Sequence, residues 1–498
     1  MSQQSRRVLP AGFSPIASLD ALAEVTAGAV EHGPRGWIVG TAGDLPEEVG
    51  IDRAALAQAG FEGKAGTSIV IPTSAGPQVL SGAGDLDELT VDVVRDAAAT
   101  AARALASTAD VLTLTLPASE LAVEAAVAAA TEGALLARYR YRSLQAEPKD
   151  KPLSRLGVEV AGADAAQVES GIAAGLVGVR AAVVARDLGN SPAGFLTATD
   201  MADVAAQLGA RFGFEAESFD REQLVALGCG GLLGVNAGST EEPRMVVLRY
   251  TPDGAPTGHL GLVGKGIMYD SGGISLKPSD PMHLLMKIDM GGAAAVMGAF
   301  TALRELGTTA RVTAWLMCTD NMPSGSATKL GDVLVARNGT TVEVKNTDAE
   351  GRLVMMDGLS LAVEEGVDAL VDIATLTGAA MMALGKSRAA LFATDDALAA
   401  RVEAAAADVD EPVWRLPLER KYRKQLDSDI ADIANLGGPH AGATTAALFL
   451  AEFVGETPWA HVDIAGTMQA EADDSWRSTG ATGFGARLLA RVAQGFSA

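Results

Sequence analysis

Apolar runs alternate with amphipathic stretches in the first third of the chain, and this pattern predicts short strands followed by helices. Strand-like runs occur at Trp37–Gly40, Ser68–Pro72 and Val111–Leu116. Helix-like stretches at Val91–Ala106 and Ser119–Ala137 carry an apolar stripe with charges between the apolar positions. Strands and helices in this order predict a small α/β domain at the N-terminal end of the chain.

The rest of the chain repeats this alternation on a larger scale. The apolar runs predicted as strands are Met245–Tyr250, Leu260–Val263, Val312–Met317, Ala369–Ile373 and Trp459–Ile464. We therefore expect a small N-terminal α/β domain over residues 1–163 with a structural or assembly role, and a connecting helix over residues 164–189. A larger α/β domain over residues 190–498 would carry the chemistry. Its helices would flank a central sheet that is mostly parallel or mixed.

A dense charged segment, Asn346–Leu353, separates two apolar elements and reads Asn-Thr-Asp-Ala-Glu-Gly-Arg-Leu. In an extended segment Asp348, Glu350 and Arg352 would point the same way, because they alternate along the chain. Gly351 would let the backbone approach whatever these side chains hold. Two carboxylates near a core repel each other unless one is protonated or a cation lies between them, so the pattern favours a metal site. These residues alone leave open an ordinary polar loop in which a carboxylate pairs with Arg352.

A second charged segment favours the metal site. Residues 262–277 begin as a short apolar strand and end in a glycine-rich loop that carries Lys265, Asp270 and Lys277, and Asp289 follows. In open α/β sheets, ligands gather beyond the carboxyl ends of the strands, so the two charged segments would meet there. Lys265 would bind a metal only as a neutral amine, whereas Lys277 would stay charged and stabilise a developing oxyanion.

The two segments together contribute four carboxylates, from Asp270, Asp289, Asp348 and Glu350. Four carboxylates at one place are too many for a single ion. Clusters that share bridging carboxylates commonly hold two divalent cations about 3.5 to 4 Å apart, an arrangement that activates a water for hydrolysis. Carboxylate and amine ligands accept Zn, Mn, Co or Mg with modest selectivity.

The charged segments resemble those of the leucyl aminopeptidase family, the two-metal cytosolic aminopeptidases. Asn346–Leu353 is identical to the family signature, and Val263–Gly266 with Asp270–Lys277 resembles the other metal-binding block. Further segments resemble family segments in family order: Asn321–Gly325, Asp372–Gly378, Trp459–Gly466 and Gly480–Gly485. The resemblance implies a metal-dependent aminopeptidase that releases N-terminal amino acids, preferably apolar Leu-like ones, from peptides through a metal-activated water.

The resemblance also implies metal ligands. Asp270 and Glu350 would bridge two ions, either Mn or Zn. Lys265 and Asp289 would complete the tightly held site, and Asp348 the more exchangeable one. The stretch between Asp270 and Asp289 departs from the family pattern in length and lacks its usual acidic segment.

Other residues would act on the substrate, again by resemblance. Lys277 would polarise the scissile carbonyl, and Arg352 would hold a bicarbonate ion that acts as the general base. Met286, Thr375 and Gly378 would line an apolar pocket for the first side chain. The resemblance further implies a homohexamer that the N-terminal domain helps to assemble.

The composition limits which classes of partner and which cellular compartment we expect. A formal net charge of −23 disfavours a nucleic-acid partner, because affinity for phosphate backbones rests largely on clustered Lys and Arg. The two cysteines, Cys229 and Cys318, suit buried thiols rather than disulfides, so we expect a cytoplasmic protein. No uninterrupted run of about 18 apolar residues occurs, and no membrane span is expected.

Functions of other classes remain as alternatives. One is an additional or replacement DNA-binding role, which the acidic composition disfavours. Another is a non-catalytic scaffold on the same fold, which the complete set of charged motif residues disfavours. A phosphoesterase using the same metals is a lesser alternative. The five histidines form no His-Glu-x-x-His pair of a single-zinc protease, and no Gly-x-Ser-x-Gly motif surrounds Ser271.

Overall fold

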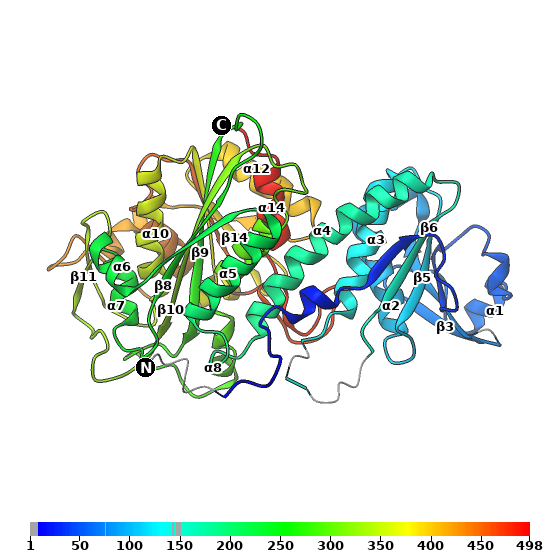
Figure 1. Ribbon diagram of the computed structural model, residues 1–498, viewed down its shortest axis with the longest axis horizontal. Helices are drawn as coiled ribbons and strands as arrows, with labels where there is room; N and C mark the ends of the chain where they lie inside the picture. Colours follow the sequence, from blue (N-terminus) through cyan, green and yellow to red (C-terminus); the bar gives the residue numbers. More distant parts are fainter. Residues whose placement is uncertain (1–7, 75, 142–143, 146–150) are drawn as a thin grey trace. The chain divides into compact units, whose positions relative to one another are not determined.

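The computed structural model describes residues 8–74, 76–141, 144–145 and 151–498. The chain forms two compact units. The larger unit comprises Met1–Ile16, Val184–Gln469 and Ala481–Ala498, and the smaller comprises Ala17–Val183 and Ala470–Gly480. Each unit combines a sheet with helices, which confirms the predicted α/β class (Figure 1).

The smaller unit is built on a six-stranded sheet in the order β1-β6-β5-β2-β4-β3, in which β3 and β4 are antiparallel. The strands are β1 (Glu24–Ala27), β2 (Arg35–Gly40), β3 (Ser68–Thr73), β4 (Gly76–Gly84), β5 (Val111–Leu116) and β6 (Arg155–Val160). The helices are α1 (Arg53–Gln58), α2 (Val91–Ala104) and α3 (Val123–Arg138). Helices α2 and α3 pack closely, since a Cβ added at Gly133 would lie 2.0 Å from the Arg95 carbonyl oxygen.

A long helix, α4 (Ala165–Asn190), covers the stretch expected to be helical at residues 164–189. Among the described helices it is the one long and apolar enough to cross a membrane, by length and composition only. In its most apolar window the mean hydropathy is 1.6, and 61% of that window is buried. A mostly buried apolar helix of this length is also what a protein core contains.

The larger unit contains an eight-stranded sheet in the order β15-β14-β17-β13-β9-β10-β8-β7. Its strands are β7 (Glu215–Phe219), β8 (Arg244–Tyr250), β9 (His259–Asp270), β10 (Arg311–Asn321), β13 (Ala369–Ala374), β14 (Ala389–Ala393), β15 (Val413–Arg415) and β17 (Trp459–Asp463). The central strands β17, β13, β9 and β10 are parallel, whereas β8 and β7 are antiparallel to their neighbours. The sheet is therefore mixed, and the apolar runs predicted as strands correspond to β8, β9, β10, β13 and β17.

Shorter elements complete the larger unit. A small sheet joins β11 (Val333–Val335), β12 (Thr341–Glu343) and β16 (Ile433–Ala434). The helices after α4 are α5 (Ala198–Phe212), α6 (Arg221–Leu227), α7 (Gly230–Asn236), α8 (Pro281–Leu284), α9 (Gly291–Phe300), α10 (Gly351–Glu365), α11 (Gly378–Leu384), α12 (Asp396–Asp408), α13 (Gly442–Ala451) and α14 (Ala486–Gln494). The short strands β18 (Gln469–Ala470) and β19 (Gly480–Ala481) flank the last segment of the smaller unit.

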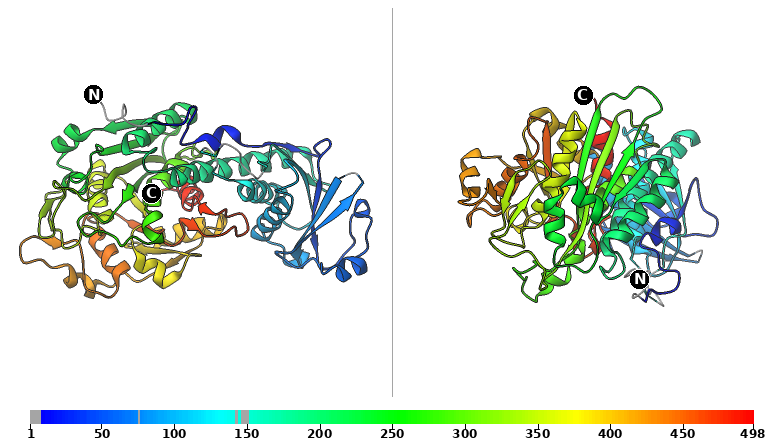
Figure 2. Two further views of the ribbon diagram at one scale, coloured as in Figure 1. Left: turned by 90° about the horizontal axis from the view of Figure 1, so that it is seen from below. Right: turned by 60° about the vertical axis from the view of Figure 1, so that its left-hand side comes forward.

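Helices cover both faces of the eight-stranded sheet. A Cβ added at Gly358 of α10 would lie 2.9 Å from Val263 Cγ1, whereas one added at Gly264 would lie 2.8 Å from Ala293 Cα of α9. Consecutive residues of β9 thus face different helices, as strand geometry requires. In the right-hand view of Figure 2, α10 (yellow) runs beside the green central strands that it contacts.

Helix α10 is buried along most of its length, and it is the apolar element that follows the charged segment. Every residue from Gly351 to Ser360 is buried. The helix ends at Gly366, whose φ of 74° is a left-handed conformation that glycine adopts without strain. A helix buried on all sides holds its first turn firmly, and that turn carries the charged segment.

Candidate metal centre

The carboxyl ends of the central parallel strands each supply a polar residue to one edge of the sheet. Asp270 ends β9, Asn321 ends β10, Asp463 ends β17, and Thr375 follows β13 directly. This edge is where open α/β sheets bind their ligands. The topology therefore places the predicted site where strand-end loops converge.

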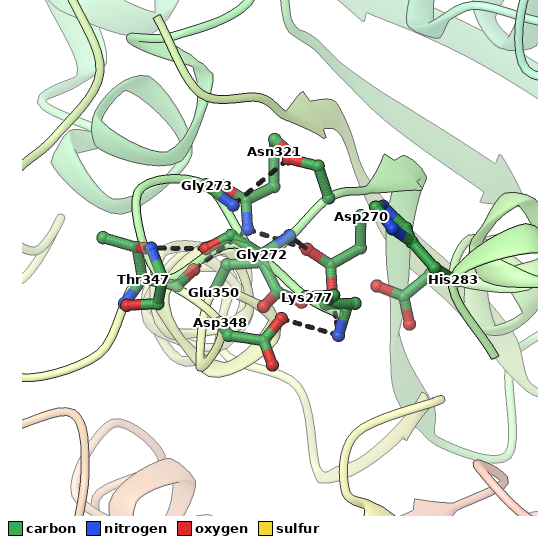
Figure 3. A network of polar contacts seen from close by, with 12 residues as sticks. Asp270, Gly272, Gly273, Lys277, His283, Asn321, Thr347, Asp348 and Glu350 are labelled. Atoms are coloured by element: carbon green, nitrogen blue, oxygen red, sulfur yellow. Dashed lines mark hydrogen bonds and ion pairs between the residues drawn. The ribbon is translucent and has the colours of Figure 1, made fainter. Parts of the chain in front are cut away.

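Three carboxylates form a compact buried cluster at this edge. Asp270, Asp289 and Glu350 each offer an oxygen, and these oxygens lie within 4.8 Å of one another. All three residues are at most 5% exposed. Asp348 joins the cluster through Lys277, which contacts both Asp348 and Asp270 (Figure 3). The structure thus brings together the four carboxylates that the sequence predicted.

The backbone that carries Asp348 and Glu350 differs from the expectation of an extended segment, which was wrong. Residues 347–348 form a turn, and Glu350 has helical dihedrals, with φ −79° and ψ −34°, immediately before α10. The carboxylates converge because a turn and the start of a helix aim them. Gly351 makes this possible, since a Cβ there would lie 2.6 Å from Lys265 Cε.

Lys265 is buried among the carboxylates. Its Nζ lies 2.8 Å from both Asp289 Oδ2 and Glu350 Oε1. It also donates a hydrogen bond of 3.0 Å to the Thr375 carbonyl oxygen. Burial opposes the charged ammonium, but Asp289, Glu350 and Asp270 outweigh burial and raise the pKa of Lys265. Without a metal, this lysine is the counter-ion of the cluster.

Lys277 lies on the more exposed side of the cluster, with 19% of its side chain accessible. Its Nζ lies 2.8 Å from Asp270 Oδ2 and 2.6 Å from Asp348 Oδ1. The pKa of Lys277 is raised, because these two carboxylates outweigh its burial. Lys277 therefore carries its charge at neutral pH on the side of the cluster that solvent reaches.

The cluster holds more negative than positive charge. Burial, together with the Glu350 carboxylate, raises the pKa of Asp270 to about 7. Burial also raises the pKa of Asp289 and that of Asp348, although Lys265 and Lys277 oppose these increases. Four carboxylates facing two ammonium groups need further cations to stay ionised.

The donor atoms fit divalent cations. Asp289 Oδ2 and Asp348 Oδ1 are buried, and each lies against a lysine ammonium, 2.8 Å from Lys265 Nζ and 2.6 Å from Lys277 Nζ respectively. Buried carboxylate oxygens that converge on one place are ligands for hard or borderline cations. The chemistry of the cluster therefore matches a metal centre.

Arg352 lies in the first turn of α10 and is 6% exposed. Burial lowers the pKa of its guanidinium to about 10, while Glu350 and Asp463 act in the opposite direction. Arg352 Nε is buried and has no hydrogen-bond partner among the described residues. A buried, charged donor of this kind can hold an anion.

Thr375 lies against the cluster, and the other two residues predicted for the substrate pocket lie in neighbouring segments. Thr375 Oγ1 donates to Asp289 Oδ1 at 2.8 Å. Met286 starts the short helical turn Met286–Ile288 that precedes Asp289. Gly378 begins α11, is exposed, and has no atom within 4 Å of where a Cβ would stand.

Sequence reasoning assigned no role to Asp463 or Asn321, although both contact site segments. Asp463 Oδ2 accepts a 2.7 Å hydrogen bond from Thr377 Oγ1, and Oδ1 accepts one of 3.2 Å from the Leu376 amide. Asp463 thus holds the loop that carries Thr375. Asn321 Nδ2 donates to Asp270 Oδ1. The signal that would have found both residues is their position at the carboxyl ends of parallel strands.

A buried network connects β13 and β17 below this loop. His461 Nδ1 lies 2.5 Å from Asp372 Oδ1, and Trp459 Nε1 donates to Asp372 Oδ2 at 2.7 Å. Burial opposes the imidazolium of His461, but Asp372 outweighs burial and raises the pKa of His461. The network fixes two of the strands whose ends shape the site.

Comparison with protein families decides the identity. The family model for the catalytic domain of the cytosol aminopeptidase family matches residues 183–490, and the model for its N-terminal domain matches residues 49–148. The chain belongs to the cytosol aminopeptidase family. It is a metal-dependent aminopeptidase, a hydrolase whose substrates are peptides. The predicted family and enzyme class are confirmed.

Relatives of the chain are named as probable cytosol aminopeptidases. A probable cytosol aminopeptidase of Solibacter usitatus is 47% identical over 373 residues, covering 74% of this chain and 76% of the relative. A probable cytosol aminopeptidase of Trichormus variabilis is 40% identical over 466 residues, covering 91% of this chain and 93% of the relative. The similarity therefore extends over both units of the chain.

Solved structures show the same fold. The bottromycin maturation enzyme BotP in complex with Mn superposes with a TM-score of 0.85 at 37% identity, covering 93% of this chain and 99% of BotP. A mutant of tomato leucine aminopeptidase superposes with a TM-score of 0.86 at 30% identity, covering 95% of this chain and 96% of that protein. These similarities confirm the predicted α/β architecture.

Proposed function

We propose that this aminopeptidase removes N-terminal amino acids, preferably apolar Leu-like ones, through a water activated by two divalent cations, Mn or Zn. The observation that carries the proposal is the buried cluster of Asp270, Asp289 and Glu350 with its shortage of positive charge. The Mn in the BotP complex supports the choice of metal. When bound, such cations polarise a carbonyl and activate a water.

The positions of the ligands suggest how they would share the ions. By resemblance to the family, Asp270 and Glu350 would be the carboxylates that both ions share, and both belong to the buried cluster. Lys265, buried beside Asp289, is charged without a metal and would complete one site as a neutral amine once a bound cation displaced its proton. Asp348, which is more exposed than the other carboxylates, would complete the more exchangeable site.

Two cationic side chains would act on the substrate rather than on the fold. Lys277 is accessible and charged, so it would hydrogen-bond to the scissile carbonyl oxygen as that oxygen gains negative charge. Arg352 would hold a bicarbonate ion as the general base, since its buried guanidinium has an unpaired Nε. This base would accept the proton of the attacking water.

The pocket for the first side chain would lie between Met286, Thr375 and Gly378. No atom lies within 4 Å of where a Cβ at Gly378 would stand, so the space beside this residue is open, and Met286 would offer an apolar contact. Apolar contacts of this kind select by size and shape.

Because the chain belongs to the cytosol aminopeptidase family, we also propose that the enzyme acts in the cytoplasm as a homohexamer, with the N-terminal domain contributing to assembly.

The test is peptide hydrolysis by metal-stripped protein that is then titrated with Mn and Zn. Leucine p-nitroanilide and the dipeptide Leu-Gly serve as substrates, and the N-acetylated forms of both serve as controls. We expect activity to return with metal and to vanish with acetylation, because the free amine is part of the recognised group. Full metal binding without any hydrolysis would instead support the scaffold role, and salt-dependent DNA binding would support the DNA-binding alternative.

A further inference from the structure

A single amide side chain joins the segments that carry the carboxylates. Asn321 is the last residue of β10 and is 4% exposed. Its Nδ2 donates to Asp270 Oδ1 at 2.8 Å and to the Thr347 carbonyl oxygen at 2.9 Å. An amide nitrogen has two N–H donors, so both are used. Figure 3 shows this amide group between Asp270 and Thr347.

The pairing of β9 with β10 is irregular next to Asn321. The register shifts at its end, where Thr319 pairs with Ile267 but Asn321 pairs with Asp270. An irregularity of this kind re-aims side chains and is common beside active sites. The Asn321 carbonyl oxygen also accepts hydrogen bonds from the Ser271 amide at 3.0 Å and from Ser271 Oγ at 2.6 Å. The main chain of Asn321 is therefore fixed to the residue after Asp270.

The third segment is tied to the same point. Thr347 Oγ1 donates to the Gly272 carbonyl oxygen at 2.7 Å and accepts a hydrogen bond of 2.8 Å from the Ser275 amide. Gly273 fits tightly between the segments, since a Cβ there would lie 2.8 Å from Asn321 Oδ1. The loops that follow β9 and β12 thus form one hydrogen-bonded unit around Asn321.

This arrangement gives the two oxygens of Asp270 different surroundings. Oδ1 accepts hydrogen bonds of 2.8 Å from the Gly272 amide and from Asn321 Nδ2. Oδ2 lies 2.8 Å from Lys277 Nζ. One oxygen is therefore held by the protein framework, and the other faces the cluster. Among the described residues, Asn321 Nδ2 supplies the side-chain hydrogen bonds that reach the Asp270 carboxylate and the Thr347 carbonyl oxygen from β10.

We propose that Asn321 is a positioning residue of the metal centre, which fixes the rotation of the Asp270 carboxylate and holds the turn that presents Asp348 and Glu350. This inference rests on the proposed metal-ligand assignment and extends it to a residue that touches neither metal nor substrate. Hydrogen bonds that orient metal ligands typically change metal affinity or activity 10- to 100-fold when they are removed.

The substitution Asn321→Asp separates this role from simple packing. It keeps the size of the side chain but removes both N–H donors and directs a carboxylate oxygen at Asp270 Oδ1 and at the Thr347 carbonyl. Asn321→Ala removes the donors without adding charge. A matched control is Asn236→Asp, because the Asn236 amide is similarly buried and donates to the Glu241 carbonyl oxygen and to Thr319 Oγ1, neither of which belongs to the carboxylate cluster.

The experiment is calorimetric titration of the metal-stripped full-length protein with Mn, together with the visible absorption spectrum of its Co form. We expect both Asn321 variants to bind Mn about 10- to 100-fold more weakly and to shift the Co absorption bands. At saturating Mn, kcat should fall while KM for leucine p-nitroanilide changes less than about threefold. Asn236→Asp should keep the affinity and the spectrum even if its melting temperature falls.

Two results would overturn the role of Asn321. One is Mn affinity and a Co spectrum identical to those of the unsubstituted protein in either Asn321 variant. The other is an equal loss of affinity in Asn236→Asp at a similar melting temperature. If Asn321→Ala and Asn321→Asp fail to fold, Asn321→Ser is measured against the same criteria. The titration does not depend on turnover, so it decides this role even if the peptide assay contradicts the proposed function.

Discussion

Lys265 Nζ lies 2.8 Å from Glu350 Oε1, and each side chain is only 3% exposed. This lysine is the innermost positive charge of the cluster, since it also contacts Asp289. Breaking a buried ion pair by removing one partner typically costs about 3–5 kcal/mol, because the other charge stays buried without compensation. The folding stability of the metal-free protein therefore depends on Lys265.

Replacing Lys265 with Met should destabilise the metal-free protein by about 3–5 kcal/mol, because three carboxylates lose their buried counter-ion. The measurement is the urea midpoint of the metal-stripped protein followed by circular dichroism. Lys329→Met, at an exposed lysine, is the control and should leave the midpoint unchanged. An unshifted midpoint for Lys265→Met would show that the carboxylates are protonated and need no counter-ion.

Replacing Glu350 with Ala should remove metal and activity together, since Glu350 lies at the centre of the buried cluster. Metal content after dialysis and hydrolysis of leucine p-nitroanilide are measured on the same sample. The control is Glu364→Ala, which changes an exposed glutamate in the last turn of α10 that pairs with Arg337. Retention of full metal and turnover by Glu350→Ala would refute the bridging assignment.

Replacing Lys277 with Ala should keep the metal but lower kcat by about 10²–10³, as expected for removal of one donor to a developing oxyanion. KM should change little, because the interaction strengthens only as charge develops. Steady-state kinetics at saturating Mn check the prediction, with metal content measured in parallel. A rise in KM at constant kcat would assign Lys277 to substrate binding instead.

The pH dependence of stability should report on His461. Its pKa is raised above the usual value near 6.5, because Asp372 outweighs burial, with Asp463 supporting the charge and Arg352 opposing it. A raised pKa means that the folded state binds the proton more tightly, so this contribution is fully present below about pH 6.5 and is lost as the pH rises through the folded-state pKa.

The substitution His461→Asn removes this contribution. The difference in urea midpoint between the unsubstituted protein and His461→Asn should be larger at pH 6 than at pH 9. Parallel titrations at several pH values in metal-free buffer make the measurement. A difference that stays constant with pH would show that His461 is neutral throughout this range.

Much of the fold and of the candidate site could be predicted from local sequence pattern. Apolar runs predicted the strands that became β9 and β10, and the rule that ligands gather at the carboxyl ends of such strands predicted that Asp270 and Glu350 lie close together. The backbone conformation of the charged segment could not be predicted in this way. Alternating charges suggest an extended strand, but the buried face of α10 extends to Gly351 and makes the segment helical there.

The local sequence pattern could not identify Asn321 and Asp463, which support the site. A polar residue at the end of an apolar run resembles any strand terminus, so nothing local distinguishes Asn321 or Asp463 from a solvated end. Their roles depend on the strand order and on the register shift of the β9–β10 pair, which arise from tertiary pairing. Strand-end position combined with a predicted parallel order would have marked both for attention.

The assembly of the site from strand ends far apart in sequence also sets when all of its segments are present. Asp270 ends β9, but the loop carrying Thr375 is held by Asp463, which ends β17 close to the C-terminus. A chain emerging from the ribosome therefore has an incomplete centre until β17 has been synthesised.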